Sequence, residues 1–154
     1  MATSAMPSVR PKEFHFPVTV DWRGGRRVAA AVDGKESVEI APPPVFRGGE
    51  DASIWSPEDL FVAAAASCLA VTFTGLAARA DLEYRSLTVD ADGVCSMRSD
   101  GRFGFTHLLL RIALETDAVD EARARQLAAQ AEEKCLVSAS LDLPVETVVE
   151  VRHE

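Results

Sequence analysis

The 154-residue chain has only three cysteines, few aromatic residues and no concentration of positive charge. Its 16 lysines and arginines are scattered along the sequence and are outnumbered by 24 acidic residues, which gives a formal net charge of −8. Nucleic acids and anionic membranes attract proteins through positive charge, so neither is expected as a partner. No basic segment followed by an apolar run and a small-residue cleavage site begins the chain. We therefore expect a cytoplasmic protein whose cysteines are free thiols.

Signatures for metal, flavin or nucleotide binding are also missing, as are internal repeats, and the cysteine spacing does not match a metal site. We expect no cofactor and no metal. The longest uncharged run, residues 61–78, approaches the length of a membrane span. It is rich in alanine and includes Ser67, Thr72 and Gly75, so it has few strongly apolar side chains to drive insertion. We expect a helix that is buried by its own protein or by a partner subunit.

The length and the hydrophobic content of 47% are enough for one well-formed core and too small for two ordinary domains. We predict a flexible tail over residues 1–12 and a single domain over residues 13–154. The tail has two prolines and no periodicity.

Alternation of apolar and polar residues, with turn residues between the segments, predicts three strands, a helix, two strands, a second helix and a last strand. Ser56 is a predicted helix cap, followed by Pro57 and two acidic residues in the first turn. This order favours an α+β fold with the central helix on a sheet. The expected elements are strands 14–20, 28–32 and 37–40, helix 57–80, strands 87–97 and 103–114, a helix from Asp117 or Asp120 to Lys134, and strand 145–151.

Two cysteines lie in or beside predicted helices, Cys68 within the alanine-rich helix and Cys135 at the end of the charged one. A lone buried cysteine usually behaves as a small hydrophobic residue, and Cys95, in a predicted strand, fits that interpretation. Two thiols at such positions favour redox chemistry over packing alone. A thiolate is the reactive form, and it needs stabilising groups nearby.

Arginine is the cation expected to stabilise a thiolate at Cys68. The candidates are Arg47, in the long loop before the helix, and Arg23, at the first hairpin. Glu58 can orient an arginine through a bidentate pair. Each also has a simpler explanation, because loop arginines are usually solvated and carboxylates are common in a first helical turn.

Helix geometry separates Glu58 from Cys68 within one chain. The two are ten positions apart, so at 1.5 Å per residue they lie about 15 Å apart on one helix. Two copies of the helix paired antiparallel about a two-fold axis near Ala63 would bring Glu58 of one chain beside Cys68 of the other, and the run of alanines from residue 63 to 66 permits close approach. We therefore predict a homodimer with two composite sites.

The chain resembles the OsmC/Ohr family of thiol-dependent peroxidases over nearly its whole length. The resemblance rests on Trp22 before the Gly24-Gly25 turn, the Phe46-Arg47 pair, residues 56–60, the stretch from Ala65 to Cys68, and residues 135–138. It implies an OsmC-like α+β fold, an intertwined homodimer with antiparallel sheets and two long helices. It also implies an antioxidant role in stress response.

By the same resemblance, Cys68 is the peroxidatic nucleophile, Cys135 resolves its sulfenic acid as a disulfide, and Glu58 is the activating acid. The arginine corresponds to Arg47 in one branch of the family and to Arg23 in the other, and we favour Arg47. The implied reaction is reduction of organic hydroperoxides, with a dithiol, of lipoyl type or a small thiol, as the reductant.

Apolar side chains near Cys68, namely Phe61, Leu69 and Phe73, would suit an organic tail better than hydrogen peroxide. Two other functions remain open. The same fold could hold a small hydrophobic ligand at the dimer interface with its cysteines idle. Cys–His hydrolysis could use His15 or His107, although both lie within predicted strands.

Overall fold

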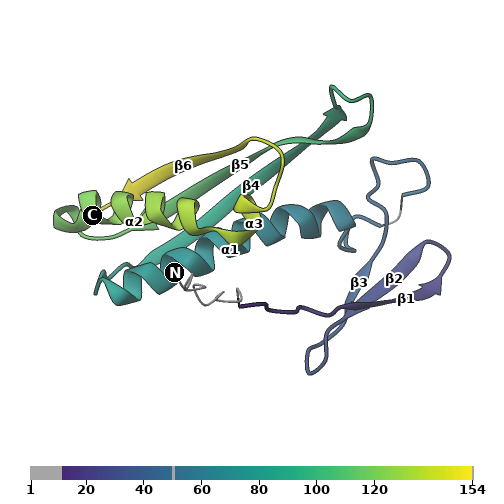
Figure 1. The fold of residues 1–154 in the computed structure, drawn as a ribbon, viewed down its shortest axis with the longest axis horizontal. Helices are drawn as coiled ribbons and strands as arrows, with labels where there is room; N and C mark the ends of the chain where they lie inside the picture. The colour runs from purple at the N-terminus through teal and green to yellow at the C-terminus, as the bar shows by residue number, and fades with distance from the viewer. Residues whose placement is uncertain (1–11, 50, 154) are drawn as a thin grey trace, which may run out of the picture. The chain divides into compact units, whose positions relative to one another are not determined.

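The computed structural model describes residues 12–49 and 51–153 (Figure 1). The chain divides into two compact units, Met1–Ile54 and Trp55–Glu154, and each has its own three-stranded sheet. Almost all of the predicted tail, residues 1–12, lies outside the described residues. The predicted single domain over residues 13–154 stays a prediction.

The first unit is an antiparallel sheet of β1 (Thr19–Gly24), β2 (Arg27–Ala31) and β3 (Val38–Ile40). Gly24 and Gly25 have positive φ angles of 106° and 55° in the turn between β1 and β2, a conformation that favours glycine. All three strands were expected from the sequence, but β1 both begins and ends later than the predicted residues 14–20.

The prediction that the first strand spans residues 14–20 is wrong at its beginning. The ladder between β1 and β2 ends at the pair Thr19–Ala31, because the chain turns immediately after β2. Residues before Thr19 therefore have no strand opposite them. Phe14 and Phe16, predicted to alternate inward, are exposed by 75% and 85%.

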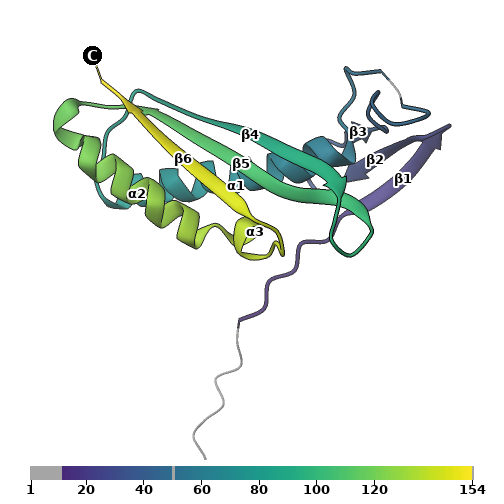
Figure 2. The same cartoon turned by 90° about the horizontal axis from the view of Figure 1, so that it is seen from above.

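The second unit has a sheet in the order β4-β5-β6, formed by β4 (Ser86–Met97), β5 (Phe103–Glu115) and β6 (Val145–Arg152). The first two strands are antiparallel, as expected, whereas β6 runs parallel to β5 (Figure 2). The expectation that the sheets are antiparallel is therefore wrong for β6. The chain leaves β5, passes through helices and re-enters the sheet in the same direction, as a parallel connection requires.

Three α-helices belong to this unit: α1 (Pro57–Arg79), α2 (Glu121–Lys134) and the short α3 (Leu136–Ala139), with a 3₁₀ turn at Ala118–Asp120. The first begins as predicted. The Ser56 hydroxyl accepts a hydrogen bond from the Asp59 amide (3.0 Å), and the Asp59 carboxylate accepts one from the Ser56 amide (2.8 Å). This capping box fixes where the helix starts.

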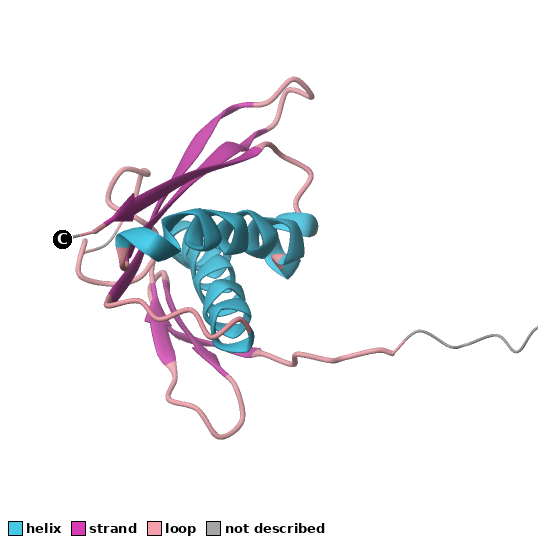
Figure 3. Ribbon diagram, turned by 90° about the vertical axis from the view of Figure 1, so that its left-hand side faces the viewer, coloured by secondary structure: helices cyan, strands magenta, loops and turns pink. Residues whose placement is uncertain are grey.

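Both long helices lie on the same side of the β4-β5-β6 sheet (Figure 3). The core between them contains Leu69 and Phe73 from α1, both fully buried. The remaining core side chains include Leu108, Leu110, Ile112 and Leu114 of β5 and Ala124, Leu127, Ala128 and Ala131 of α2. By length and composition, α1 is long and apolar enough to cross a membrane, but its inner face packs here as that of a core helix.

Gly93 of β4 brings the sheet close to α1. A methyl group at this position would lie 2.6 Å from Cγ2 of Val62 and 2.7 Å from Cε1 of Phe105. Both distances are too short for real carbon contacts, so the close packing of α1 on the sheet depends on a residue without a side chain here.

Candidate functional site

The structure brings Cys68 and Cys135 together, although they are far apart in the sequence. Cys68 lies in α1, and Cys135 lies between α2 and α3, both of which contact α1. The two are free thiols, and hydrogen bonding with Cys135 is one of the causes that lower the pKa of Cys68. Cys135 is fully buried, whereas Cys68 is partly exposed. A small molecule therefore reaches Cys68 first.

The pKa of the Cys68 thiol is lowered from its ordinary value. Burial acts against this, because it disfavours the charged thiolate. Hydrogen bonds to the sulfur outweigh burial; they come from the Val137 amide, the Cys135 thiol, the Leu136 amide and the Thr72 hydroxyl. Cys68 is consequently ionised at a lower pH than an ordinary cysteine, which makes it the better nucleophile.

The local backbone explains how amides come to face Cys68. Cys135 has an extended conformation (φ −66°, ψ 109°), which ends α2 and begins α3. Leu136 and Val137 are the first two residues of α3, where backbone N–H groups have no acceptor within the helix. The Ser138 hydroxyl donates to the Cys135 sulfur over 3.3 Å, so this short helix contacts both sulfurs.

None of these donors was predicted from the sequence. Thr72 has a signal there, because it is four positions after Cys68 on one helix and residues at that spacing are neighbours. The amides have none, because any residue except proline has an amide N–H group. A cation was expected at Cys68, whereas the groups in this unit that lower its pKa are uncharged hydrogen-bond donors.

Glu58 lies near Cys95, on β4. The pKa of the Cys95 thiol is raised, first by burial and then by the negative charge of Glu58. Cys95 therefore stays protonated at a pH at which Cys68 ionises. This agrees with the packing role predicted for Cys95. The Oε2 atom of Glu58 is buried and has no hydrogen-bond partner among the described residues.

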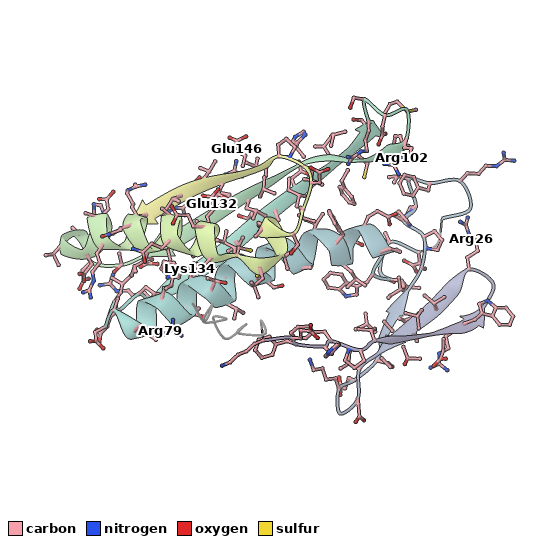
Figure 4. The ribbon with its side chains drawn as sticks, in the orientation of Figure 1. Arg26, Arg79, Arg102, Glu132, Lys134 and Glu146 are labelled. Carbon is pink, nitrogen blue, oxygen red and sulfur yellow. The ribbon has the colours of Figure 1, made fainter. Side chains whose placement is uncertain are left out.

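Arg23 and Arg47 belong to the other unit, and both are exposed. Arg26, labelled in Figure 4, donates from Nη1 to the carbonyl oxygens of Arg47 (2.8 Å) and Gly48 (3.2 Å). These bonds hold the loop that carries Arg47 against the turn between β1 and β2. That Arg47, in preference to Arg23, stabilises the Cys68 thiolate stays a prediction.

The apolar residues expected beside Cys68 have different surroundings. Leu69 and Phe73 are fully buried in the core, and Phe61 stacks on Phe105 with ring centroids 4.4 Å apart. The expectation that Leu69 and Phe73 contact an organic substrate is therefore wrong, because both side chains lie in the core beneath the sheet.

Exposed apolar side chains near Cys68 come instead from Val71 and Leu136, exposed by 70% and 75%. Val71 is three positions after Cys68 on α1, which places the two side chains side by side on the helix. The Leu136 backbone is also near Cys68, since its amide is one of the groups that lower the pKa of that thiol. Both residues offer exposed apolar surface in the second unit.

No histidine is among the groups that shift the pKa of Cys68 within the described residues. His107, on β5, is exposed, and His15 belongs to the first unit. No group of three or more His, Cys, Asp or Glu side chains within residues 12–49 and 51–153 is placed to hold a metal ion.

Three comparisons with known proteins bear on this chain. The model of a family described as OsmC-like protein matches residues 49–150. The uncharacterized protein YmaD of Bacillus subtilis is 26% identical over 143 residues, which cover 90% of this chain and 93% of that protein.

Among solved structures, an OsmC-like protein of unknown function from Vibrio cholerae superposes with a TM-score of 0.78 at 21% identity, covering 91% of this chain and all of that one. The organic hydroperoxide resistance protein OhrB of Bacillus subtilis superposes with a TM-score of 0.62 at 25% identity, covering 90% of this chain and 98% of that one. Both likenesses extend over nearly the full length of this chain.

Proposed function

The chain belongs to the OsmC-like protein family, and we propose that it is a thiol-dependent peroxidase that reduces organic hydroperoxides. The proposal rests on one observation above all. Cys68 is partly exposed and its pKa is lowered, and the fully buried Cys135 is one of the groups that lower it. An accessible thiol beside a second, buried sulfur supports a pair of peroxidatic and resolving cysteines.

In the proposed cycle, the Cys68 thiolate attacks the distal oxygen of the hydroperoxide. The O–O bond breaks, the alkoxide takes a proton and leaves as an alcohol, and Cys68 becomes a sulfenic acid. The sulfur of Cys135 then attacks the Cys68 sulfur, so a disulfide forms and water leaves. An external dithiol reduces that disulfide by exchange and is itself oxidised.

Glu58 and an arginine, Arg47 in preference to Arg23, complete the proposed site. The buried Oε2 of Glu58 is an acceptor without a donor in its own unit, and buried carboxylate oxygens are costly unless they are hydrogen-bonded. A guanidinium can satisfy it as a bidentate partner. In the proposed homodimer, antiparallel pairing of two α1 helices near Ala63 would bring Glu58 of one chain to Cys68 of the other.

The surroundings of Cys68 support an organic substrate. The exposed side chains of Val71 and Leu136 offer apolar surface beside the sulfur. An alkyl or aryl group would remove part of this surface from water, at about 25 cal/mol per Å², whereas hydrogen peroxide has no such group. We also expect the protein to act in the cytoplasm.

A peroxidase assay with a dithiol tests the proposal. Cumene hydroperoxide should be consumed catalytically by the wild type, and one equivalent without dithiol should remove two thiols from the protein. Cys68→Ser should be inactive. Cys135→Ser should consume about one equivalent, because its sulfenic acid has no resolving partner.

A protein that only binds a hydrophobic ligand would lose no thiols at low equivalents. A wild type that is inert with every organic hydroperoxide tried would contradict the peroxidase proposal and favour that alternative. Cys95→Ser is the matched control, and it should keep wild-type turnover.

A further inference from the structure

The loop that carries Arg47 contains a tight turn at residues 46–49. The Gly49 amide donates to the carbonyl oxygen of Phe46 (2.9 Å), and Gly48 has a φ angle of 78°. A hydrogen bond from the fourth residue to the first, with a positive φ at the third, fits a type II turn. Arg47 is the second residue of this turn, so the peptide that joins it to Gly48 is the central one.

Arg26 binds this central peptide from the turn between β1 and β2. Its Nη1 atom donates to the carbonyl oxygen of Arg47 (2.8 Å) and to that of Gly48 (3.2 Å). A methyl group at Gly48 would overlap the same Nη1 atom, so the guanidinium lies directly against the backbone. The turn that carries Arg26 is itself braced, because Nε1 of Trp22 donates to the carbonyl oxygen of Gly25 (3.0 Å). The contact therefore joins two ordered turns of the first unit.

We propose that Arg26 is a positioning residue, which fixes the backbone at Arg47 and so holds the Arg47 guanidinium ready to act at Cys68. The inference rests on the proposed function, which gives Arg47 that role. A charged donor makes stronger hydrogen bonds than a neutral one, so two bonds from Arg26 restrain the turn. A side chain on a mobile backbone spends less time in the productive geometry, and the reaction slows accordingly.

Trypsin measures the restraint on the turn without reference to activity, because it cleaves the bond between Arg47 and Gly48. In Arg26→Met this bond should be cleaved several-fold faster, since a segment must open locally before a protease cuts it. Cleavage after the exposed Arg102, between β4 and β5, is the internal reference. Lys35→Met removes a positive charge between β2 and β3 and is the matched control. An unchanged cleavage rate in Arg26→Met would overturn the proposal.

A double-mutant cycle tests whether Arg26 acts through Arg47. The value of kcat/KM for cumene hydroperoxide is measured, with excess dithiol, for the wild type, Arg26→Met, Arg47→Met and the double variant. Arg26→Met should lower it about fivefold, which corresponds to one hydrogen bond of ordinary strength. In the Arg47→Met background the same substitution should change it little, because the guanidinium that Arg26 positions is already absent. Equal losses in the two backgrounds would overturn the positioning role.

The results separate this inference from the proposed function. If the wild type is active and Arg47→Met keeps its kcat/KM, the peroxidase proposal stands and the role of Arg26 is overturned. The same conclusion follows if trypsin cleaves Arg26→Met faster but its kcat/KM is unchanged, since the contact is then structural only. If the wild type reduces no hydroperoxide, the proposed function fails and the positioning role fails with it, whatever trypsin shows of the contact.

Discussion

Each of the three cysteine thiols has its own environment, which sets its reactivity. Cys68 has hydrogen-bond donors and a lowered pKa, Cys95 has burial, the charge of Glu58 and a raised pKa, and Cys135 is fully buried. The pKa of the same kind of thiol is thus lowered at one position and raised at another, because the surroundings favour or disfavour the charged form.

These environments predict the order in which the thiols react. Iodoacetamide at neutral pH should modify Cys68 first, since it combines a larger thiolate fraction with access to solvent. Cys95 should react more slowly. Raising the pH should reduce the difference between the two alkylation rates, because the Cys95 thiol then ionises as well. Peptide mass spectrometry of samples taken over time measures the alkylation rate of each cysteine. Faster labelling of Cys95 than of Cys68 would contradict the environments described.

Thr72 is the side-chain donor whose removal tests the hydrogen bonds most simply. Thr72→Val keeps the shape but loses the hydroxyl that stabilises the thiolate. The pKa of Cys68 should therefore rise, and the pH at which hydroperoxide reduction reaches its plateau should rise with it.

Thr72→Ser, which keeps a hydroxyl, is the control and should stay close to the wild type. The readout is the initial rate of cumene hydroperoxide consumption from pH 5 to pH 9. A shift of the same size in both variants would point to packing rather than to the hydrogen bond.

Packing between elements sets the distance between the α1 helix and the sheet. Gly93 on β4 is surrounded by Val62 of α1 and by Phe105 and Leu108 of β5. Since α1 carries Cys68, a displacement of this helix from the sheet would also disturb the contact between α1 and α3.

Gly93→Ala should therefore destabilise the fold. The added methyl group overlaps its neighbours, and overpacking of this kind costs about 1–3 kcal/mol in free energy of unfolding. Gly104→Ala on β5 is the matched control, because its methyl group would lie 3.4 Å from Cδ of Arg98 at an ordinary contact distance. Urea denaturation of both variants compares them, and equal stability would contradict the close packing.

At the scale of the whole molecule, large apolar side chains are exposed in both units. They include Phe14, Phe16, Val18, Val20 and Trp22 in the first unit and Val71 in α1. A second copy of the chain is the proposed cover for part of this surface.

The proposed two-fold axis near Ala63 can be tested by introducing a charged side chain there. Ala63→Glu would place two carboxylates close together in a paired α1, so the dimer should dissociate and hydroperoxide reduction should fall with it. Ala78→Glu, at the other end of the helix and exposed, should leave the dimer intact. Sedimentation equilibrium at micromolar concentration decides; a monomeric wild type would refute the composite site.

The local pattern of the chain determined most of its elements. The Ser56 cap, the glycine turns and the alternation around residues 98–102 predicted the long helices and most strands, because each depends on near neighbours in sequence; the start of β1 and the short α3 were not predicted. Cys68, Cys135 and Glu58 were also chosen as site residues from their sequence positions, and the resemblance to a family supplied their roles.

Only the tertiary structure decided which groups meet. It placed the Leu136 and Val137 amides at Cys68 and Glu58 near Cys95, and it made β6 parallel to β5. These contacts join residues that are tens of positions apart, and they follow from how helices pack on a sheet rather than from any local pattern. A backbone amide is present in every residue except proline, so only its position in space can assign it a role.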